Sequence, residues 1–471
     1  MRPEMQPSAT PPTADAASPA PGHSIKRRQF LKSTAMVGAA GLILPRLKLF
    51  GAEAPSNKLN IALMGTWGRA EAHFDVLSRE NVVAICDVNE KHLAFGAAKF
   101  PQATRYADWR KCLEQKDIDA VVCATTDHTH AFITNWAMNR GKHVYCEKPL
   151  ANSVEEARMI RATWLKNKDK LATQVGTQRH EFDNFNRVRE MIQDGAIGQL
   201  QEACAWGDRQ IRRPGYLPAE GDPPEYLHYD LWLGPSPFHP YNPGYFSGGS
   251  GANCLQWNMY WDFGSGQVGD MGSHTMDLAW NAIDAHLPVS AEGKGDPVNP
   301  EVTPVKLETH FEFPANDWRS SILVSWYQGG AMPESPHRAI DLRKIDHGAM
   351  FEGSEGFIVA DFQSHILIPQ KNVADRSQAD MTYYKPRAKE ALIPPLGNFQ
   401  SQWINACKGS LKTSCDFGYA SDMIETMLLG LVAYRAGKKI KYDGVAGQVT
   451  DCPEASQFLG RSYRDGWTMN G

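Results

Sequence analysis

The sequence lacks several features that would point to a membrane, a nucleic acid or a metal. No uncharged apolar run approaches the roughly 20 residues that a spanning helix needs, so we expect no stable membrane span. Positive charge is not in excess, because 49 Lys and Arg stand against 53 Asp and Glu, and nucleic acid is not an expected partner. The nine cysteines include no C-x-x-C pair and no metal-site spacing, so no bound metal is expected. At 471 residues the chain is long enough for two domains.

The cysteines are expected to be buried thiols. Cys86, Cys123 and Cys146 lie in or directly after apolar runs that are typical of core strands. A Cys407–Cys415 disulfide is the less favoured alternative, and it requires an oxidising compartment.

The first 54 residues have the pattern of a targeting segment. The pair Arg27-Arg28 precedes an apolar stretch at 35–44 and a small-x-small site at 52–54. This order resembles a twin-arginine export signal; the alternative is a basic amphipathic helix. We expect cleavage after Ala54, export by the twin-arginine route and a periplasmic location. Cleavage would leave 42 basic and 50 acidic residues, a net charge of −8.

The stretch from residue 59 to 69, LNIALMGTWGR, organises the first domain. An apolar run at 59–64 is followed by Gly65 and Gly68 and then by a segment that can be helical. Strand, glycine turn and helix form the phosphate-binding start of a dinucleotide fold. Trp67 stands where the usual G-x-G-x-x-G motif has its second glycine, so an ordinary tight turn in an α/β domain is the alternative.

Three further apolar runs continue the same pattern. The run at 82–86 ends in Asp87, where a carboxylate accepts the ribose hydroxyls of NAD and repels a 2′-phosphate. The run at 120–124 precedes Thr125-Thr126-Asp127, and the run at 143–146 precedes Glu147-Lys148-Pro149. We therefore expect an N-terminal Rossmann domain, a doubly wound parallel sheet, over residues 55–150.

The pattern changes beyond residue 200. Runs that alternate apolar and polar residues predict antiparallel strands covered on one face, at 200–206, 305–313, 321–326 and 357–361. Helices are expected at 184–194, 399–408 and 419–436. We assign residues 151–440 to a second domain, which contains a long loop rich in aromatic residues, glycine and proline near 209–265, and residues 441–471 to a C-terminal tail.

Four motifs occur in the order seen in a known family: the glycine turn, Asp87, Glu147-Lys148-Pro149, and the stretch from Asp270 to His274, DMGSH. Over nearly all of residues 57–440 the chain resembles the glucose-fructose oxidoreductase/inositol dehydrogenase/rhizopine catabolism (Gfo/Idh/MocA) family. The resemblance implies an NAD-binding Rossmann domain and a C-terminal α/β domain built on an open, mostly antiparallel sheet. It also implies a homo-oligomer, a dimer or a tetramer.

The resemblance implies three catalytic residues. Lys148 would reach the crevice above the sheet and hold a sugar hydroxyl. Asp270 and His274 are four residues apart and would share one helix face, where they would bind substrate hydroxyls while His274 acts as general base. Asp277 would orient either the helix or the substrate.

The expected contacts form two sets. The NAD contacts are Gly65, Trp67, Gly68, Arg69, Asp87, Thr125, Thr126, His128, His130, Glu147 and Lys148. The contacts to a carbohydrate or glycoside substrate are Gln178, Arg179, His180, Tyr229, Trp257, Trp261, Asp270 and His274. Two alternatives stay open: helix capping by Asp127 with a half-buried histidine in the 125–130 loop, and plain hydrophobic packing of the aromatic residues in the 209–265 loop.

The sequence thus predicts an exported, NAD-dependent oxidoreductase that acts on sugars or glycosides. No useful pool of free NAD exists outside the cytoplasm, so the cofactor must be restored while it stays bound. Oxidation of a glycoside at C3, elimination of the aglycone, addition of water and reduction would do this and give net hydrolysis without the usual pair of carboxylates. The alternatives are a glycoside 3-dehydrogenase that releases a 3-keto sugar and a non-catalytic sugar-binding Rossmann protein.

Overall fold

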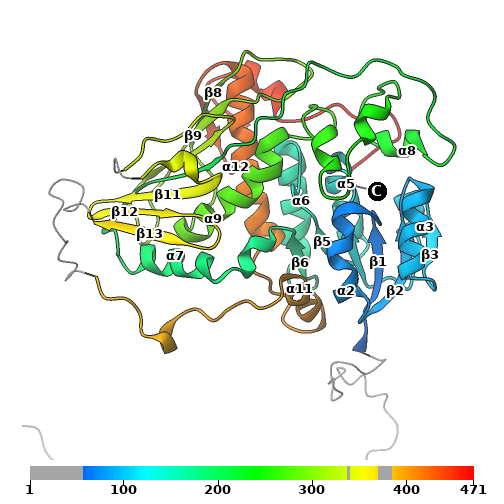
Figure 1. The fold of residues 1–471 in the computed structure, drawn as a ribbon, viewed down its shortest axis with the longest axis horizontal. Coiled ribbons are helices and arrows are strands. Elements are labelled where there is room, and N and C mark those ends of the chain that lie inside the picture. Colours follow the sequence, from blue (N-terminus) through cyan, green and yellow to red (C-terminus); the bar gives the residue numbers. More distant parts are fainter. Residues whose placement is uncertain (1–56, 337–339, 370–383, 471) are drawn as a thin grey trace, which may run out of the picture. The chain divides into compact units, whose positions relative to one another are not determined.

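The computed structural model describes residues 57–336, 340–369 and 384–470 (Figure 1). The expected signal segment and its cleavage site at Ala54 lie outside the described residues. Among the described residues, no helix has both the length and the apolar character that a membrane crossing requires.

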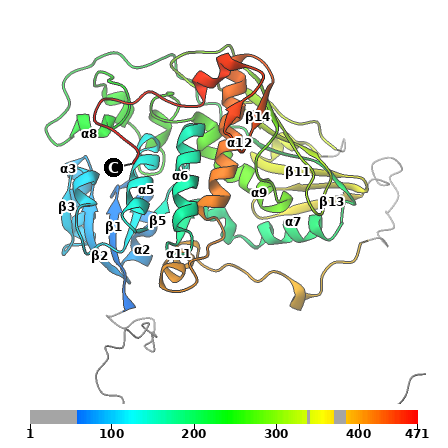
Figure 2. The same cartoon turned by 180° about the vertical axis from the view of Figure 1, so that it is seen from behind.

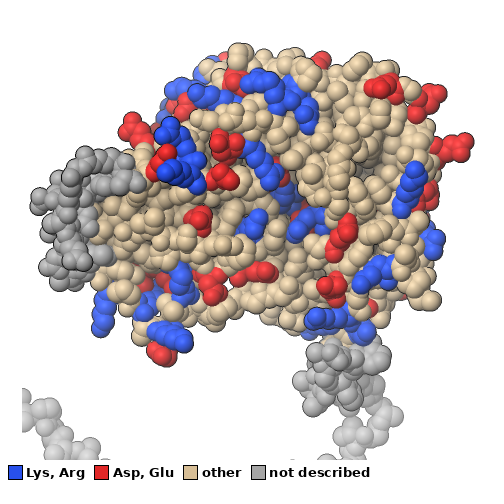
Figure 3. All heavy atoms as spheres, in the orientation of Figure 1, with Lys and Arg blue, Asp and Glu red and all other residues tan. Residues whose placement is uncertain are grey.

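On the face drawn in Figure 3, Lys and Arg are interspersed with Asp and Glu, without a block of one sign.

The N-terminal sheet is parallel and has six strands in the order β3-β2-β1-β4-β5-β6. This is the doubly wound order of a dinucleotide-binding fold. The strands are β1 Asn60–Met64, β2 Asn81–Cys86, β3 Thr104–Tyr106, β4 Ala120–Cys123, β5 His143–Cys146 and β6 Thr173–Val175. The helices between them are α2 Phe74–Leu77, α3 Glu90–Lys99, α4 Trp109–Cys112, α5 Asp127–Asn139 and α6 Val154–Asn167. The central strands β1 and β4 are almost fully buried, which explains their unbroken apolar sequences.

The first sheet extends beyond the expected domain boundary at residue 150. Strand β6 pairs with β5 in register, Cys146 opposite Val175. Helix α11 (Phe399–Lys408) then returns from the far end of the sequence, and its Phe399 and Trp403 pack in the same core as Leu63. The division between the two domains is therefore not a single point in the sequence.

The second sheet has nine strands in the order β13-β12-β11-β7-β10-β9-β8-β14-β15. Its pairs are antiparallel except β7 with β10, which are parallel. The strands are β7 Leu200–Gly207, β8 Ser290–Gly295, β9 Leu307–Phe313, β10 Ile322–Gln328, β11 His347–Gly353, β12 Gly356–Ala360, β13 His365–Pro369, β14 Ile440–Asp443 and β15 Gln448–Val449. Strands β14 and β15 lie in the expected C-terminal tail, so part of that segment belongs to this sheet.

Three helices accompany the second sheet: α7 Asp183–Gln193, α9 Ser273–Ile283 and α12 Phe417–Ala436. Helix α12 packs against both α6 and strand β8, and both views place α6 and α12 between the labelled strands of the two sheets (Figures 1 and 2). Gly430 lets α12 lie close to the sheet, because a Cβ there would come within 2.7 Å of Thr309 Cγ2 and 2.9 Å of Phe311 Cζ.

The loop expected at 209–265 is a folded insertion. It contains α8 (Tyr229–Leu233) and two short helical turns, Pro243–Phe246 and Asn253–Gln256. Its aromatic side chains form their own hydrophobic core, which includes Trp232, Tyr245, Trp257, Tyr260 and Phe263. This packing gives the insertion a fixed shape without long helices or strands.

The last residues of the chain cross back to the first domain. The end of the chain lies beside α5 in both views (Figures 1 and 2). The Asn135 side chain donates to the Met469 carbonyl at 2.6 Å, and the Trp136 indole donates to the Thr468 carbonyl at 2.7 Å. These two hydrogen bonds attach the C-terminal segment to helix α5.

We expect Gly430→Ala to destabilise the protein by about 1–3 kcal/mol, because overpacking a core contact costs this much. Urea unfolding followed by circular dichroism measures the change. Gly249→Ala is the control, since a Cβ there meets no atom within 4 Å. Equal stability of the two variants would show that α12 moves away from the sheet without cost.

Candidate functional site

A cavity of about 550 Å³ lies at the carboxyl ends of the parallel strands. Gly65 follows β1, Asp87 follows β2, Thr125 follows β4 and Lys148 follows β5, and all four line it. Open α/β sheets bind their ligands at this edge. The other walls come from the second domain and from the insertion: Arg209, Trp232, Trp257, Asp270 and His274.

The glycine turn approaches the neighbouring strand closely. Gly65 has φ +80°, and a Cβ on it would lie 2.3 Å from the Ala124 carbonyl oxygen. Only glycine fits such a position, and the same absence of a side chain leaves room for a pyrophosphate. Trp67, in place of the second glycine, stacks on His92 with ring centroids 4.5 Å apart, and both rings line the cavity.

Asp87 holds the turn and still faces the cavity. Its carboxylate accepts bonds from Thr66 N at 2.9 Å, Thr66 Oγ1 at 3.1 Å and Asn89 N at 2.9 Å. A carboxylate has about four acceptor positions, so capacity remains for a ribose hydroxyl. The close glycine approach and this carboxylate fit the ribose and pyrophosphate of NAD.

Glu147 is a buried carboxylate in the cavity wall that binds two side chains of the first domain. It is 3% exposed and accepts from Arg69 Nε and His73 Nε2, both at 2.9 Å. Burial acts to raise its pKa, but the Arg69 charge and the His73 bond outweigh burial and lower the pKa of Glu147 to about 2. Gly176 leaves space for this carboxylate, since a Cβ there would lie 2.3 Å from Oε2.

Lys148, Asp270 and Arg209 form a charge cluster at the other end of the cavity. Lys148 Nζ lies 2.6 Å from Asp270 Oδ1, and Arg209 Nη1 lies 2.6 Å from Asp270 Oδ2. Burial acts to raise the pKa of Asp270, but the two cations outweigh it and lower that pKa. Burial acts to lower the pKa of Lys148, but the Asp270 and Asp127 carboxylates help to raise it. Asp270 is therefore an anion and Lys148 a cation at neutral pH.

His274 lies one turn beyond Asp270. Asp270 stands in a π-helical turn, Val268–Gly272, that continues directly into α9, and π-helical turns are frequent at functional sites. Burial and the Lys148 charge lower the pKa of His274 well below its usual value. The ring is neutral at pH 7, and its buried Nδ1 has no hydrogen-bond partner among the described residues. It can therefore accept a proton from a substrate.

Asp277 orients the helix rather than the substrate. It is fully buried and accepts bonds from His180 Nε2 at 2.8 Å and Tyr419 Oη at 2.6 Å. His180, expected to contact substrate, is used in this bond and does not line the cavity. Burial acts to lower the pKa of His180, but Asp277 outweighs it and raises that pKa well above its usual value, so the two form a buried ion pair.

The two histidines of the 125–130 loop have different surroundings. His128 Nε2 contacts the Trp232 carbonyl oxygen at 2.8 Å and its ring lies against Phe263, so it joins the loop to the insertion and does not line the cavity. His130 does line the cavity; its Nδ1 lies 2.8 Å from the Pro149 carbonyl oxygen and its Nε2 lies 3.1 Å from that of Thr125. Both carbonyls can only accept, so both ring nitrogens donate and His130 is an imidazolium.

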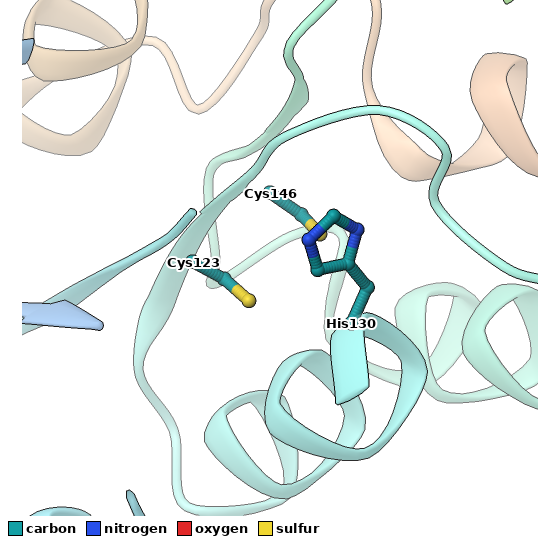
Figure 4. Close-up of side chains that lie close together, drawn as sticks. All are labelled: Cys123, His130 and Cys146. Atoms are coloured by element: carbon teal, nitrogen blue, oxygen red, sulfur yellow. The ribbon is translucent and has the colours of Figure 1, made fainter. Parts of the chain in front are cut away.

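Cys123 and Cys146 lie under this ring on adjacent strands (Figure 4). The three side chains are close enough to share a metal ion, but both nitrogens of His130 are already bonded to carbonyls. Burial acts to raise the pKa of Cys123, whereas the bond from Cys146 and the His130 charge lower it. We therefore assign the cluster to a buried thiolate–imidazolium pair that supports the 125–130 loop.

Most of the expected contacts line the cavity, and five do not. Those that line it are Gly65, Trp67, Arg69, Asp87, Thr125, Thr126, His130, Glu147, Lys148, Gln178, Arg179, Trp257, Asp270 and His274. Those that do not are Gly68, His128, His180, Tyr229 and Trp261.

Physical reasons explain the remaining three exceptions. Tyr229 is buried and donates to the His239 carbonyl at 3.0 Å. Trp261 donates to the Asn299 carbonyl at 2.9 Å and lies under Arg435. Gly68 faces the insertion, since a Cβ there would lie 3.4 Å from Asn253 Oδ1. These contacts account for the absence of Gly68, Tyr229 and Trp261 from the cavity lining.

Arg209, Cys254 and Asp127 are not among the contacts expected from the sequence, although all three line the cavity. Arg209 follows the predicted strand at 200–206 by three residues, and this position at a strand end was the available signal. Nothing in the sequence near Cys254 indicates its position.

Comparison with known proteins agrees with this geometry. A model of an "Oxidoreductase family, NAD-binding Rossmann fold" matches residues 59–176, and one of an "Oxidoreductase family, C-terminal alpha/beta domain" matches residues 216–313. A twin-arginine translocation pathway signal matches residues 24–43.

Similar sequences cover only part of each protein. Inositol 2-dehydrogenase of Klebsiella pneumoniae is 33% identical over 160 residues, which are 32% of this chain and 47% of the relative. Levoglucosan dehydrogenase of Pseudarthrobacter phenanthrenivorans is 33% identical over 117 residues, which are 25% of this chain and 29% of the relative. The chain therefore matches about half or less of the length of these relatives.

Solved structures show the same fold over most of the chain. The WlbA dehydrogenase of Bordetella pertussis, in complex with NADH and UDP-GlcNAcA, has a TM-score of 0.56 at 16% identity and covers 82% of this chain and 99% of its own. Levoglucosan dehydrogenase in complex with NADH and levoglucosan has a TM-score of 0.54 at 17% identity, with 82% and 99% covered.

The chain has a Rossmann domain and a C-terminal domain on a mostly antiparallel sheet, and both match models of an oxidoreductase family, the first of them NAD-binding. The chain belongs to the Gfo/Idh/MocA family and carries a twin-arginine signal. Its cofactor is NAD.

Acid should destabilise the wild-type protein more than the Glu147→Gln variant. Because the pKa of Glu147 falls from 4.5 to about 2 on folding, its contribution is complete above about pH 4.5 and is lost as the pH falls toward 2. The shift corresponds to about 3 kcal/mol. Urea unfolding between pH 2 and pH 7 measures it, with Glu114→Gln as an exposed control. Parallel pH profiles for wild type and Glu147→Gln would contradict the assignment.

Proposed function

We propose that this protein is an exported, periplasmic oxidoreductase that acts on sugars or glycosides with tightly bound NAD. The observation that carries the proposal is the cluster of Lys148, Asp270 and the neutral His274 in one cavity with the glycine turn and Asp87. The nicotinamide, when bound, supplies an acceptor for a hydride from a sugar carbon.

Asp270, Lys148 and His274 each have a different role toward the sugar in this proposal. Asp270 is an anion and can accept hydrogen bonds from sugar hydroxyls while it holds Lys148 and Arg209 in place. The Lys148 ammonium can donate to the oxygen that becomes a carbonyl, which stabilises negative charge there. His274 can take the hydroxyl proton as general base, since its ring is neutral and lines the cavity.

Tight retention of NAD is supported by how the insertion meets the first domain. Glu90 N donates to the Tyr226 carbonyl at 2.8 Å, and His228 N donates to the Val88 carbonyl at 2.9 Å. His228 Nε2 also lies 2.7 Å from Glu90 Oε1, and Lys91 Nζ lies 3.6 Å from the Tyr226 ring centre. The insertion thus bonds to the loop that follows Asp87, where the ribose of NAD would lie.

A retained cofactor favours a closed redox cycle. In our finer proposal the substrate is a glycoside that is oxidised at C3, so that the C2 proton becomes acidic and the aglycone leaves from C1. Addition of water and return of the hydride complete a net hydrolysis. The cavity serves this cycle with a base in His274 and a carbonyl-stabilising cation in Lys148. A 3-dehydrogenase that stops at the ketone is the second candidate, supported by the dehydrogenase relatives.

Weakening the insertion should release NAD. The double variant Tyr226→Ala/His228→Ala removes the exposed His228–Glu90 side-chain contact and a cation–π contact, each worth up to about 1 kcal/mol, so we expect NAD to dissociate up to about 30-fold faster. Mass spectrometry of the natively purified protein and cofactor loss during dialysis measure this. Lys439→Ala is the control, since it breaks an ion pair with Glu312 in the second sheet. Unchanged retention would show that the insertion does not hold the cofactor.

Turnover of a glycoside in deuterium oxide tests the finer proposal. We expect deuterium at C2 of the released sugar and no turnover of 3-deoxy glycosides, because the ketone at C3 is what acidifies the C2 proton. Release of a 3-keto sugar would favour the 3-dehydrogenase. Turnover of 3-deoxy substrates would exclude oxidation at C3, and a bound-cofactor absorbance that no glycoside changes would favour a non-catalytic sugar-binding protein.

A further inference from the structure

Asp127 is a buried carboxyl group that the roles described so far do not use. It is the first residue of α5, it is 7% exposed, and it lines the cavity. Among the described residues its carboxyl oxygens take part in no hydrogen bond and no ion pair, so Asp127 does not cap α5, and the N-cap residue Thr126 makes no side-chain capping bond either. A buried polar group without a partner is costly unless a ligand supplies one.

The groups around Asp127 come from five parts of the chain. His130 lies on the same helix, Lys148 follows β5, Asp270 stands in the π-helical turn, Arg461 belongs to the C-terminal segment, and Cys254 belongs to the insertion. Burial raises the pKa of Asp127 to about 7 with help from Asp270, against the opposing charges of His130, Lys148 and Arg461. The carboxyl group is therefore poised between its two protonation states near neutral pH.

Three neighbouring titratable groups, Asp270, Lys148 and His274, are poor proton donors near neutral pH. Asp270 is kept ionised by two cations at 2.6 Å. Lys148 is kept protonated by the Asp270 carboxylate 2.6 Å away, and His274, whose pKa is lowered by burial and by the Lys148 charge, is the base of the proposed cycle. A general acid works best when its pKa is close to the working pH, and Asp127 alone among these four groups meets that condition.

We propose that Asp127 is the general acid that protonates the departing aglycone oxygen. This rests on the net hydrolysis proposed above. In the elimination from a 3-keto glycoside, a base removes the C2 proton, and the electron pair of that C–H bond forms a C1–C2 double bond. The C1–O bond to the aglycone breaks, and its electron pair goes to the aglycone oxygen, which takes the proton of Asp127. No electrons are gained or lost. When water adds across the C1–C2 double bond, its hydroxide goes to C1 and its proton restores Asp127, while the protonated base returns a proton to C2.

The leaving group decides how much this acid matters. A 4-nitrophenyl aglycone departs as a stable anion and needs no proton, whereas a methyl aglycone departs as a strongly basic alkoxide. For Asp127→Asn we expect kcat/KM to fall about 10²- to 10⁴-fold on methyl glycosides, the usual contribution of a general acid, and to change little on 4-nitrophenyl glycosides. Asp127→Glu should recover part of the activity on methyl glycosides.

The pH profile gives a second readout. With methyl glycosides the wild-type rate should fall above about pH 7, where Asp127 loses its proton, and this basic limb should be absent in Asp127→Asn. Asp75→Asn is the matched control, because Asp75 also lies in the first turn of a helix of the first domain but is exposed. Its activity on both substrates should equal that of the wild type.

Two outcomes would overturn the assignment, and they are distinguishable from failure of the proposed function. Equal losses on both glycosides with an unchanged NAD content would show that Asp127 acts before the aglycone leaves. A lower NAD content of purified Asp127→Asn would show that Asp127 binds the cofactor. If the wild-type enzyme releases no aglycone from any glycoside, the net hydrolysis itself is wrong, and the role of Asp127 fails with it.

Discussion

The buried ion pair between Lys148 and Asp270 joins the two domains of this protein in the wall of the cavity. Lys148 follows a strand of the first sheet, Asp270 precedes a helix of the second domain, and the two charged atoms lie 2.6 Å apart. Losing one partner of a buried pair costs about 3–5 kcal/mol, because the other charge stays buried without compensation. Movement of one domain that separates the pair leaves Lys148 without this carboxylate, whereas Asp270 keeps its bond to Arg209. Pro149 adds a steric limit, since it packs against Gly269 beside Asp270.

Helix α9, which carries His274, is fixed by hydrogen bonds on its side away from the cavity. Asp277, three residues along, receives bonds from His180 and from Tyr419 of α12. These bonds fix the rotation of α9, so that Asp270 and His274 both face the cavity while Asp277 faces away from it. The buried ion pair of Asp277 with His180 fixes the helix that carries the neutral His274. The imidazole is therefore already placed for proton transfer, which reduces the reorganisation that the proposed reaction needs.

The strands that could be predicted from the sequence are those whose packing is uniform along their length. Strands β1, β4 and β5 are buried on both faces and read as apolar runs. Strands β3, at the edge of its sheet, and β8, with glycine and charged residues, were not predicted, because partial burial leaves no clear pattern. Strand β7 was expected to be covered on one face, yet it is buried from Ala203 onward, because α9 packs on one side and residues such as Leu342 and Val359 on the other.

Among the site residues, too, local regularity decides which positions could be predicted from the sequence. The positions of Lys148, Asp270 and His274 in the cavity wall could be predicted, because a strand end or a helix repeat fixes their direction within a few residues. Tyr229, Trp261 and His180 could not, because a side chain in an irregular segment turns toward whichever neighbour satisfies it, and those neighbours are His239, Asn299 and Asp277. Arg209 has only its position after a strand as a local signal, and its bond to Asp270 joins segments 61 residues apart in the sequence.

Under the proposed closed redox cycle, the insertion would separate retention of the cofactor from exchange of the substrate. Its backbone bonds reach the loop after β2, at the nucleotide end of the cavity, whereas the charge cluster lies beyond β5. An enzyme that works without a supply of free NAD must hold the dinucleotide through many turnovers and still release a sugar after each one. Binding both at a single closed site would slow one process whenever the other was improved. Because the insertion bonds to the first domain at the ribose end, the strength of that contact can rise without closing the path to Lys148 and His274, and this division is what a closed redox cycle requires.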